Sequence, residues 1–541
     1  MRVLLISINA KYIHTNNAVR LLKVNSSFQP TIFEYTIKDD IDTIIKDIES
    51  FQPDVVGFST YIWNVSIIKN ILNELKLEGK IVLGGPEVSY DSLYFLDNTN
   101  ADIIVKGEGE QVFESLLHAI HNKTSLVDIP SITTYENGKL INNPIQEIKH
   151  LEELHMPYYL EEDITQIPNK IAYIESSRGC PYKCSYCLSS LEKTVRFFPL
   201  QTVQNAIEYL LNNGAKTIKF LDRTFNANKH TFDLLDFIIK QHNHTTVFQF
   251  EITGDILDPN IITYLNQNAP KGLFRFEIGI QSTNPMTNKL VDRFQNTERL
   301  FHNIQLIQSA NIIDLHLDLI AGLPLEDLSS FQKTFDSVFR LKSKELQLGF
   351  LKMLRGTKIR NQSDLYDYVY DQNAPYEIIE NNVLSKQDIK EIHLVEHMLE
   401  LYHNKGYFKE EMLQLILSKE SPYAFFKEIG EHYLKHKYPM RQYQLEDIYN
   451  HIFELLSNKE IFALKKDYLN RSKIKPKIFF NNDISKEEKK LVFTILSNKT
   501  NYPINLFYKH GVLIKYELEY YTVLYQNNES QNFTIHLKKT P

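Results

Sequence analysis

Apolar runs and helical spacings alternate along the first part of the chain. Residues 3–8 form a short apolar run, and residues 54–59 form a continuous one, which is typical of a strand covered on both faces. Residues 67–77 have apolar positions at helical spacing. Glycine turns follow two further strand-like runs, at residues 84–86 and 107–110. Strand, turn and helix in series predict a doubly wound parallel sheet that binds ligands at the carboxyl ends of its strands.

A second series of strand-like runs begins at residue 170. Six such runs are predicted, at residues 170–174, 216–220, 248–253, 273–282, 313–320 and 345–351. Helical spacing separates them, so six βα units predict a partial TIM-type (β/α)6 barrel. The reactive side chains of such barrels lie at the carboxyl ends of the strands. We therefore expect the chemistry of this region where each run ends.

The pattern changes again after about residue 372. Helical spacing is found in four segments, at residues 384–405, 410–417, 422–437 and 444–456, and strands are predicted at residues 475–480, 512–518 and 520–525. These segments predict a mainly helical α+β region. Prolines at 144, 157 and 168 break up the stretch before the barrel, since proline cannot donate to a strand ladder. The predicted domains are thus residues 1–140, a connector at 141–169, the barrel at 170–371 and an accessory domain at 372–541.

Composition narrows the class of protein further. The 541 residues are 43% hydrophobic and 23% charged, as in globular proteins, and a length above ~300 residues predicts several domains. No apolar run approaches the ~20 residues that span a bilayer, so we expect no membrane partner. The formal net charge of −7 gives no general attraction for nucleic acid, which is not an expected partner.

All three cysteines of the chain lie within eight positions. Cys180, Cys184 and Cys187 have C-x3-C-x2-C spacing and leave no fourth cysteine for a paired disulfide framework. A structural zinc site would need another protein ligand. Three thiolates on one loop suit a 4Fe–4S cluster whose fourth iron stays open to a substrate or cofactor. A cluster of this kind, and free thiols, favour a reducing, cytoplasmic compartment.

This loop resembles the cluster-binding loop of the radical S-adenosylmethionine (SAM) superfamily. The cysteine spacing is that of the family, and Tyr186 supplies the aromatic residue before the last cysteine. The resemblance implies that the open iron binds SAM and that reductive cleavage of SAM yields a 5′-deoxyadenosyl radical. It also implies SAM contacts at strand ends. These are Asp222 and Arg223 at the methionine end, Glu251, Gln281 and Ser282 around ribose and carboxylate, and Gly322 and Pro324 in the turn after strand five. Many relatives have glutamate at the position of Gln281.

The upstream region is similar to the cobalamin-binding domain of cobalamin-dependent radical SAM enzymes. The residues that carry this resemblance, and that it implies as cofactor contacts, are Ser59, Thr60, Gly84, Gly85, Pro86, Gly107 and Glu108. The Asp-x-His-x-x-Gly loop of many cobalamin proteins is absent, but the corresponding loop ends in His14. Neutral imidazole is a competent cobalt ligand. His14 is therefore either a ligand or an ordinary histidine before a helix, and both interpretations stay open.

The combined resemblance implies an enzyme with a 4Fe–4S cluster, SAM and cobalamin. It implies methyl transfer to an unactivated carbon or phosphorus of an unknown substrate, with a flavodoxin- or ferredoxin-type reductant. The alternatives are a rearrangement or cyclisation without methyl transfer, or a cobalamin- and SAM-binding sensor without turnover. Methylthiolation of tRNA is disfavoured because relatives with that activity carry extra cluster cysteines. The last region resembles a C-terminal region of unassigned function found in a subgroup of the family.

Overall fold

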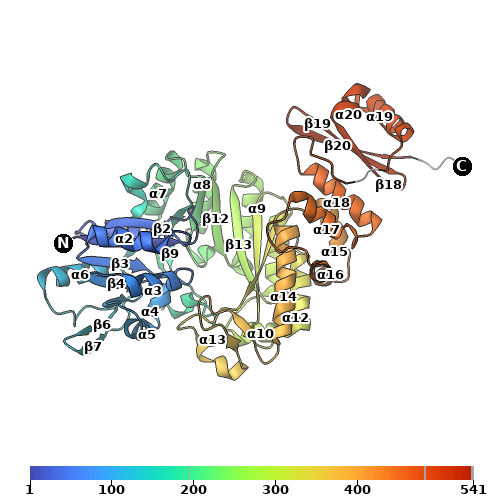
Figure 1. Ribbon diagram of the computed structural model, residues 1–541. Helices are drawn as coiled ribbons and strands as arrows, with labels where there is room; N and C mark the ends of the chain where they lie inside the picture. Colours follow the sequence, from blue (N-terminus) through green and yellow to red (C-terminus); the bar gives the residue numbers. More distant parts are fainter. Residues whose placement is uncertain (193, 481–482, 538–541) are drawn as a thin grey trace. The chain divides into compact units, whose positions relative to one another are not determined.

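The chain divides into two compact units. The computed structural model describes residues 1–192, 194–480 and 483–537. The first unit comprises Met1–Asp327 with Gly349–Lys386, and the second comprises Leu328–Leu348 with Gln387–Pro541 (Figure 1). The predicted N-terminal domain and most of the predicted barrel therefore belong to one unit. No helix of the described residues is long and apolar enough to cross a membrane.

The N-terminal region contains a seven-stranded sheet in the order β2-β1-β3-β4-β5-β6-β7. Its strands are β1 (Val3–Asn9), β2 (Thr31–Thr36), β3 (Val55–Ser59), β4 (Lys80–Gly84), β5 (Ile103–Val105), β6 (Ile132–Glu136) and β7 (Lys139–Asn142). The strands β1 to β5 are parallel, and β6 and β7 add an antiparallel edge. This sheet confirms the predicted doubly wound fold, and it continues to Asn142.

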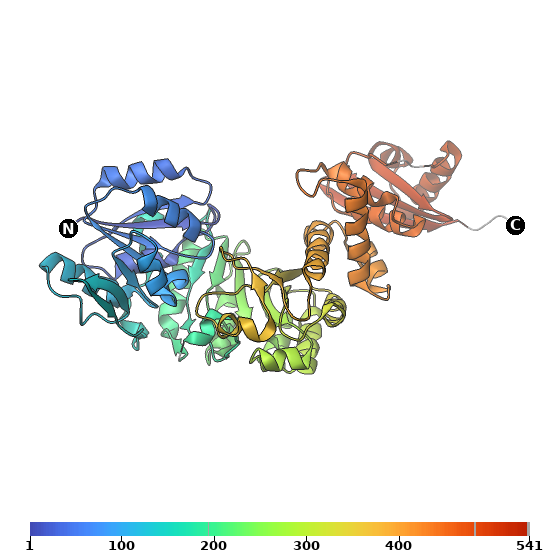
Figure 2. The ribbon, with the colours of Figure 1, turned by 60° about the horizontal axis from the view of Figure 1, so that its bottom comes forward.

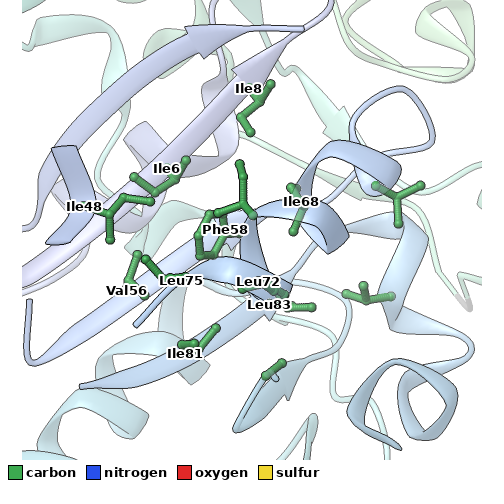
Figure 3. Close-up of a cluster of buried hydrophobic side chains, with 14 of the residues drawn as sticks. Ile6, Ile8, Ile48, Val56, Phe58, Ile68, Leu72, Leu75, Ile81 and Leu83 are labelled. Carbon is green, nitrogen blue, oxygen red and sulfur yellow. The ribbon is translucent and has the colours of Figure 1, made fainter. Parts of the chain in front are cut away.

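Helices cover both faces of this sheet. On β1, Leu4, Ile6 and Ile8 point to the face covered by α2 (Ile41–Phe51) and α3 (Val65–Glu74) (Figure 3). The alternate positions Val3 and Leu5 point to the face covered by α6 (Glu110–Asn122). Successive side chains of a strand point to opposite faces of the sheet, and each face has its own apolar core. This explains why the strands are continuous apolar runs in the sequence.

The second sheet is the partial barrel, and five of its six strands lie wholly in the first unit. Its strand order is β15-β14-β13-β12-β11-β8, with β8 (Ala172–Ile174), β11 (Thr217–Phe220), β12 (Val247–Ile252), β13 (Phe274–Gln281), β14 (Asp314–Ala321) and β15 (Glu345–Phe350). The strands β8 to β14 are parallel. Helices α7 (Leu200–Asn212), α8 (Thr231–Gln241), α9 (Pro259–Asn268) and α11 (Thr297–Gln308) connect them. The predicted six-stranded barrel is confirmed.

The C-terminal region is mainly helical and ends in a small sheet. It contains α14 (Lys386–Met398), α15 (Glu410–Leu417), α16 (Pro422–His436), α17 (Leu445–Phe453), α18 (Asn458–Asn470), α19 (Lys486–Thr500) and α20 (Ile504–His510). The antiparallel strands β18 (Gly511–Tyr516), β19 (Glu519–Gln526) and β20 (Glu529–His536) pack with α19 and α20 (Figure 2).

One strand predicted for the C-terminal region is absent. Residues 475–480 have no regular structure. Pro476 cannot donate to a ladder. The apolar residues Phe479 and Phe480 instead pack on Tyr468, with ring centroids 5.0 and 5.9 Å away. Phe479 and Phe480 are therefore apolar because they pack against an aromatic ring, and they do not belong to a strand.

Candidate active site

The three cysteines lie on one loop that begins at a short hairpin. The strand β9 (Ser177–Arg178) pairs with β10 (Arg196–Phe197) and brings the two ends of the loop together. Gly179 has φ +92°, and a Cβ there would stand 2.2 Å from the carbonyl oxygen of Thr194. The two backbone segments can therefore approach closely only because this residue is glycine. The three cysteines are free thiols, and Cys184 is buried.

A half-buried arginine, Arg293, lies against the cysteine loop. Arg293 Nη1 is 3.8 Å from Cys184 Sγ and 3.4 Å from the hydroxyl of Tyr186. Its Nη2 donates to the carbonyl oxygen of Gly279. Burial raises the pKa of the Cys184 thiol, and the positive charge of Arg293 opposes that shift. Arg293 therefore favours the thiolate, the form that binds iron.

Asp222 organises the segment that leads into the loop. Its carboxylate accepts hydrogen bonds from Ser176 N at 2.9 Å, Ser176 Oγ at 2.5 Å and Ser177 Oγ at 2.6 Å. The residue is 1% exposed, and burial raises its pKa to about 6. The hydrogen bonds from the two serines oppose this shift. Asp222 thus holds the backbone between β8 and β9.

Three of the predicted SAM contacts carry polar groups near the strand ends. Arg223 Nη1 lies 3.8 Å from Glu251 Oε2, and Lys219 Nζ lies 3.9 Å from Glu251 Oε1. Burial raises the pKa of Glu251, and the two cations oppose the shift. Gln281 ends β13 at a bulge with φ +67°, and its Oε1 is buried without a hydrogen-bond partner among the described residues.

The other three predicted SAM contacts are engaged within the protein. Ser282 is fully buried and its Oγ donates to Glu326 Oε1 at 2.5 Å. The carbonyl oxygen of Gly322 accepts from the Tyr368 hydroxyl at 2.8 Å. The carbonyl oxygen of Pro324 accepts from Thr287 Oγ1 at 2.9 Å. These groups shape the turns after β13 and β14.

A cavity of about 1710 Å³ lies between the N-terminal sheet and the barrel. Its N-terminal wall lies at the carboxyl ends of β3, β4 and β5, and its other wall includes part of the cysteine loop and Arg223. The predicted corrin contacts that line it are His14, Ser59, Gly84, Gly85, Pro86, Gly107 and Glu108. Single-ligand pockets usually measure ~300–1,000 Å³. This cavity therefore has room for more than one small ligand.

Thr60 does not line this cavity but shapes the turn beside it. The Thr60 backbone N–H donates to the carbonyl oxygen of Gly84 at 2.7 Å, and its side chain is buried. Gly85 has φ +116°, and a Cβ there would stand 2.5 Å from the Thr60 carbonyl oxygen. Glycine is thus required for the chain to pass Thr60 and reach the cavity.

His14 links the N-terminal region to the barrel. Its Nδ1 is 2.7 Å from the Tyr173 hydroxyl, and it forms an isolated parallel bridge with Ile171. Burial lowers the pKa of His14, and the charges of Lys11 and Lys219 lower it further. The ring is therefore neutral at pH 7, and Nε2 is the nitrogen that it offers to a ligand.

A buried network of ion pairs joins the predicted corrin loop to the cysteine loop. Arg178 contacts Glu108 at 3.1 Å, Glu110 at 2.6 Å and Glu175 at 2.9 Å. Arg196 also contacts Glu108, at 2.7 Å. Burial alone would raise the pKa of Glu108. The hydrogen bond from Arg196 and the charge of Arg178 outweigh burial and keep this pKa below its usual value. Glu108 thus pairs within the protein as well as lining the cavity.

Sequence reasoning found Arg223 but missed Arg293 and Arg178. Arg293 follows no motif and reaches Cys184 only through the fold, so no sequence signal could have found it. Arg178 directly precedes Gly179 and Cys180, and Glu108 lies in a glycine turn that was singled out. Each of these two residues lies next to a motif in the sequence, but this position does not show that Arg178 and Glu108 form an ion pair.

Comparisons with known proteins agree with this geometry. Three family models match successive parts of the chain: "B12 binding domain" at residues 6–117, "Radical SAM superfamily" at 174–338 and "Protein of unknown function (DUF4080)" at 364–534. The uncharacterized methyltransferase PH0819 of Pyrococcus horikoshii is 25% identical over 410 residues, which cover 72% of this chain and 84% of that protein.

Two further proteins extend the comparison. The cobalamin-dependent radical SAM methyltransferase TokK of Streptomyces tokunonensis is 22% identical over 323 residues, 54% of this chain and 46% of TokK. This chain thus spans about half the length of TokK. The solved structure of the cobalamin-dependent SAM radical enzyme OxsB with aqua-cobalamin bound has a TM-score of 0.61 at 13% identity, and the match covers 87% of this chain and 79% of OxsB. That likeness shows a shared fold.

The described residues accept the groups that these families bind. Three free thiols lie on one loop, and a half-buried arginine favours the thiolate form of one of them. The carboxamide oxygen of Gln281 has no hydrogen-bond partner in the part of the chain that the structure describes, and the large cavity ends at the glycine turns of the N-terminal sheet. The chain therefore contains a B12-binding domain followed by a radical SAM domain, and its cofactors are a 4Fe–4S cluster, SAM and cobalamin.

Proposed function

We propose that the protein is a cobalamin-dependent radical SAM methyltransferase that methylates an unactivated carbon of its substrate. The cavity carries this proposal, because the carboxyl ends of the N-terminal strands and part of the cysteine loop face the same space. When bound, the cluster and SAM supply a 5′-deoxyadenosyl radical, and cobalamin supplies the methyl group. The related protein PH0819 is named as a methyltransferase, and TokK as a cobalamin-dependent one.

The cysteine loop provides the cluster ligands in this proposal. The thiolates of Cys180, Cys184 and Cys187 would hold the cluster, and Tyr186 lies beside Cys184. Arg293 favours the thiolate of Cys184 and fixes this residue relative to Gly279, because the guanidinium contacts both. Its charge also lowers the electrostatic cost of adding an electron at this position.

The strand ends of the barrel provide the groups that bind SAM. The guanidinium of Arg223 attracts a carboxylate, and Glu251 suits an ammonium or ribose hydroxyls. The unpartnered Oε1 of Gln281 accepts a hydrogen bond from the same ligand. Asp222, Ser282, Gly322 and Pro324 act indirectly, by holding the turns that carry these groups.

The N-terminal region holds the corrin through backbone approach and apolar contact. The turns at Gly84–Pro86 and Gly107 lie at strand ends and leave room for a wide ligand. His14 offers Nε2 to cobalt or lines the pocket as a neutral ring. The domain limits proposed for this arrangement are residues 1–140, 141–169, 170–371 and 372–541.

The reaction needs an electron donor and a substrate from outside the chain. We assign the first role to a flavodoxin- or ferredoxin-type reductant, which belongs to the same reducing, cytoplasmic compartment as the three free thiols.

The experiment is an anaerobic assay of the reconstituted protein. Protein loaded with iron, sulfide and cobalamin is reduced in the presence of SAM, and the products are separated by chromatography. Deoxyadenosine together with S-adenosylhomocysteine and retained corrin is the expected result. Cys187→Ala should lose iron and both products, while Lys80→Met, an exposed site on β4, should keep them.

Other outcomes separate the alternatives. Deoxyadenosine with bound corrin but no S-adenosylhomocysteine would replace methyl transfer by a rearrangement or cyclisation. Deoxyadenosine without retained corrin would overturn the role assigned to the N-terminal region. Neither product from a fully loaded protein would favour a sensor without turnover.

A further inference from the structure

We propose that the C-terminal region contains a zinc site built by His432, His436 and Glu454. Among the described residues, these three form a group whose potential ligand atoms all lie within 4.8 Å of one another. Two histidines and one glutamate are a ligand set that proteins use for Zn²⁺, with a water molecule in the remaining position. The site belongs to the second unit and is independent of the proposed methyl transfer.

Helix geometry places the two histidines together. They lie four residues apart in the last turns of α16, so their side chains share one face of the helix. Their ring centroids are 4.2 Å apart with the planes inclined by 48°. Glu454 is the C-cap of α17 and places Oε2 3.9 Å from His436 Nε2. The site therefore joins two helices.

Hydrogen bonding leaves the correct nitrogen atoms available. His436 Nδ1 is 3.0 Å from the carbonyl oxygen of His432, so it must carry the proton, and Nε2 keeps a lone pair for a metal. His432 Nε2 is shielded from solvent and has no hydrogen-bond partner among the described residues. A buried ring nitrogen without a partner is destabilising unless something binds it. Zinc would satisfy both nitrogens.

The surroundings also favour a cation. Both helices present their C-terminal ends here, where unpaired carbonyl groups give a partial negative charge. The ring of Tyr438 packs against His436 with centroids 5.4 Å apart and lies 5.8 Å from His432, which limits the freedom of both ligands. Preorganised imidazoles lose less conformational entropy when they bind a metal.

The test measures zinc on the full-length protein after its cluster has been reconstituted. The cysteines are then occupied by iron and do not compete for the added Zn²⁺. We expect one tightly held zinc per chain by mass spectrometry after dialysis. Loss of a residue that only hydrogen-bonds to a metal ligand weakens metal binding by about 10–100-fold. His432 and Glu454 are ligands in this proposal, so His432→Ala and Glu454→Gln should each weaken zinc binding by at least about 100-fold.

A matched control is available in the first unit. His118 and Glu114 are also four residues apart and lie 3.1 Å from each other, but no third potential ligand joins them among the residues that the structure describes. His118→Ala should therefore bind zinc as the wild type does. Glu454 is an exposed side chain, so Glu454→Gln keeps the fold and tests the ligand alone. Zinc should also raise the melting temperature of the wild type but not of Glu454→Gln.

Two results would overturn the site. The first is a cluster-loaded wild type that retains no zinc after dialysis. The second is zinc binding by Glu454→Gln and His432→Ala that is as tight as in the wild type, because the metal would then occupy other residues.

Discussion

Replacing Arg178 by methionine should destabilise the first unit strongly. The Arg178 side chain is 9% exposed, and its three carboxylate partners at Glu108, Glu110 and Glu175 are 17%, 6% and 16% exposed. Methionine fills similar space but leaves these carboxylates without their shared cation. Removing one partner of a buried ion pair costs about 3–5 kcal/mol, because the remaining charge is buried and uncompensated.

The assay is urea unfolding followed by tryptophan fluorescence. Trp63 is the only tryptophan of the chain, and it lines the cavity that the network borders, so its signal reports on the first unit alone. With an m-value of about 3 kcal/mol per M of urea, the expected loss lowers the unfolding midpoint by about 1–1.7 M. Reconstituted iron should also fall, since Arg178 adjoins the cysteine loop.

The matched control removes an exposed cation from the same unit. Lys80 pairs with Asp102 at 2.7 Å, and the two side chains are 54% and 31% exposed. Such pairs contribute about 0–1 kcal/mol, so Lys80→Met should change the midpoint little. Adding Glu110→Gln to Arg178→Met should recover part of the loss. If Arg178→Met unfolds at the same urea concentration as Lys80→Met, the network does not stabilise the first unit and the reasoning is wrong.

Three further predictions concern the turns around the cavity. Burial raises the pKa of Asp222 from 3.8 to about 6, so the folded state binds this proton more tightly. The unfolding free energy should fall by at most about 3 kcal/mol as the pH rises from about 4 to 6. Asp222→Asn should abolish this pH dependence in urea titrations. An unchanged pH dependence in Asp222→Asn would contradict its assignment to Asp222. Gly85→Ala forces a Cβ against Thr60 and should lower the free energy of unfolding by about 1–3 kcal/mol. The variant should also lose the absorbance of retained cobalamin. Gly138→Ala, whose Cβ meets nothing within 4 Å, should keep the corrin. Tyr376→Phe removes the hydroxyl that donates to buried Glu87 and should lower the free energy of unfolding in urea by about 1–3 kcal/mol. Tyr135→Phe removes an exposed hydroxyl that hydrogen-bonds Asp97 and should change this free energy very little. Equal effects of the two substitutions would refute the role of burial.

Local pattern predicted most of the architecture. The alternation of Val3 to Ile8 between two faces, and the strand ends followed by glycine turns, specify a doubly wound sheet without knowledge of distant contacts. The same logic found the six barrel strands. It failed at residues 475–480, because apolar side chains that pack on Tyr468 give the same local signal as a strand.

The sequence by itself indicated the cluster loop of this protein, and the resemblance of its motifs to known families implied SAM and cobalamin. Cysteine count and spacing identify a cluster loop because they limit which metal centres can form, whatever the surrounding fold. Only the tertiary structure decided which polar residues are buried and which partners they meet. Arg293 reaches Cys184, and Arg178 collects carboxylates from two regions, through contacts between residues 68 to 109 positions apart. Asp222 and Ser282, by contrast, lie at strand ends but are buried, with hydrogen bonds inside the protein. Burial and partner choice depend on packing between distant segments, and no local pattern encodes them.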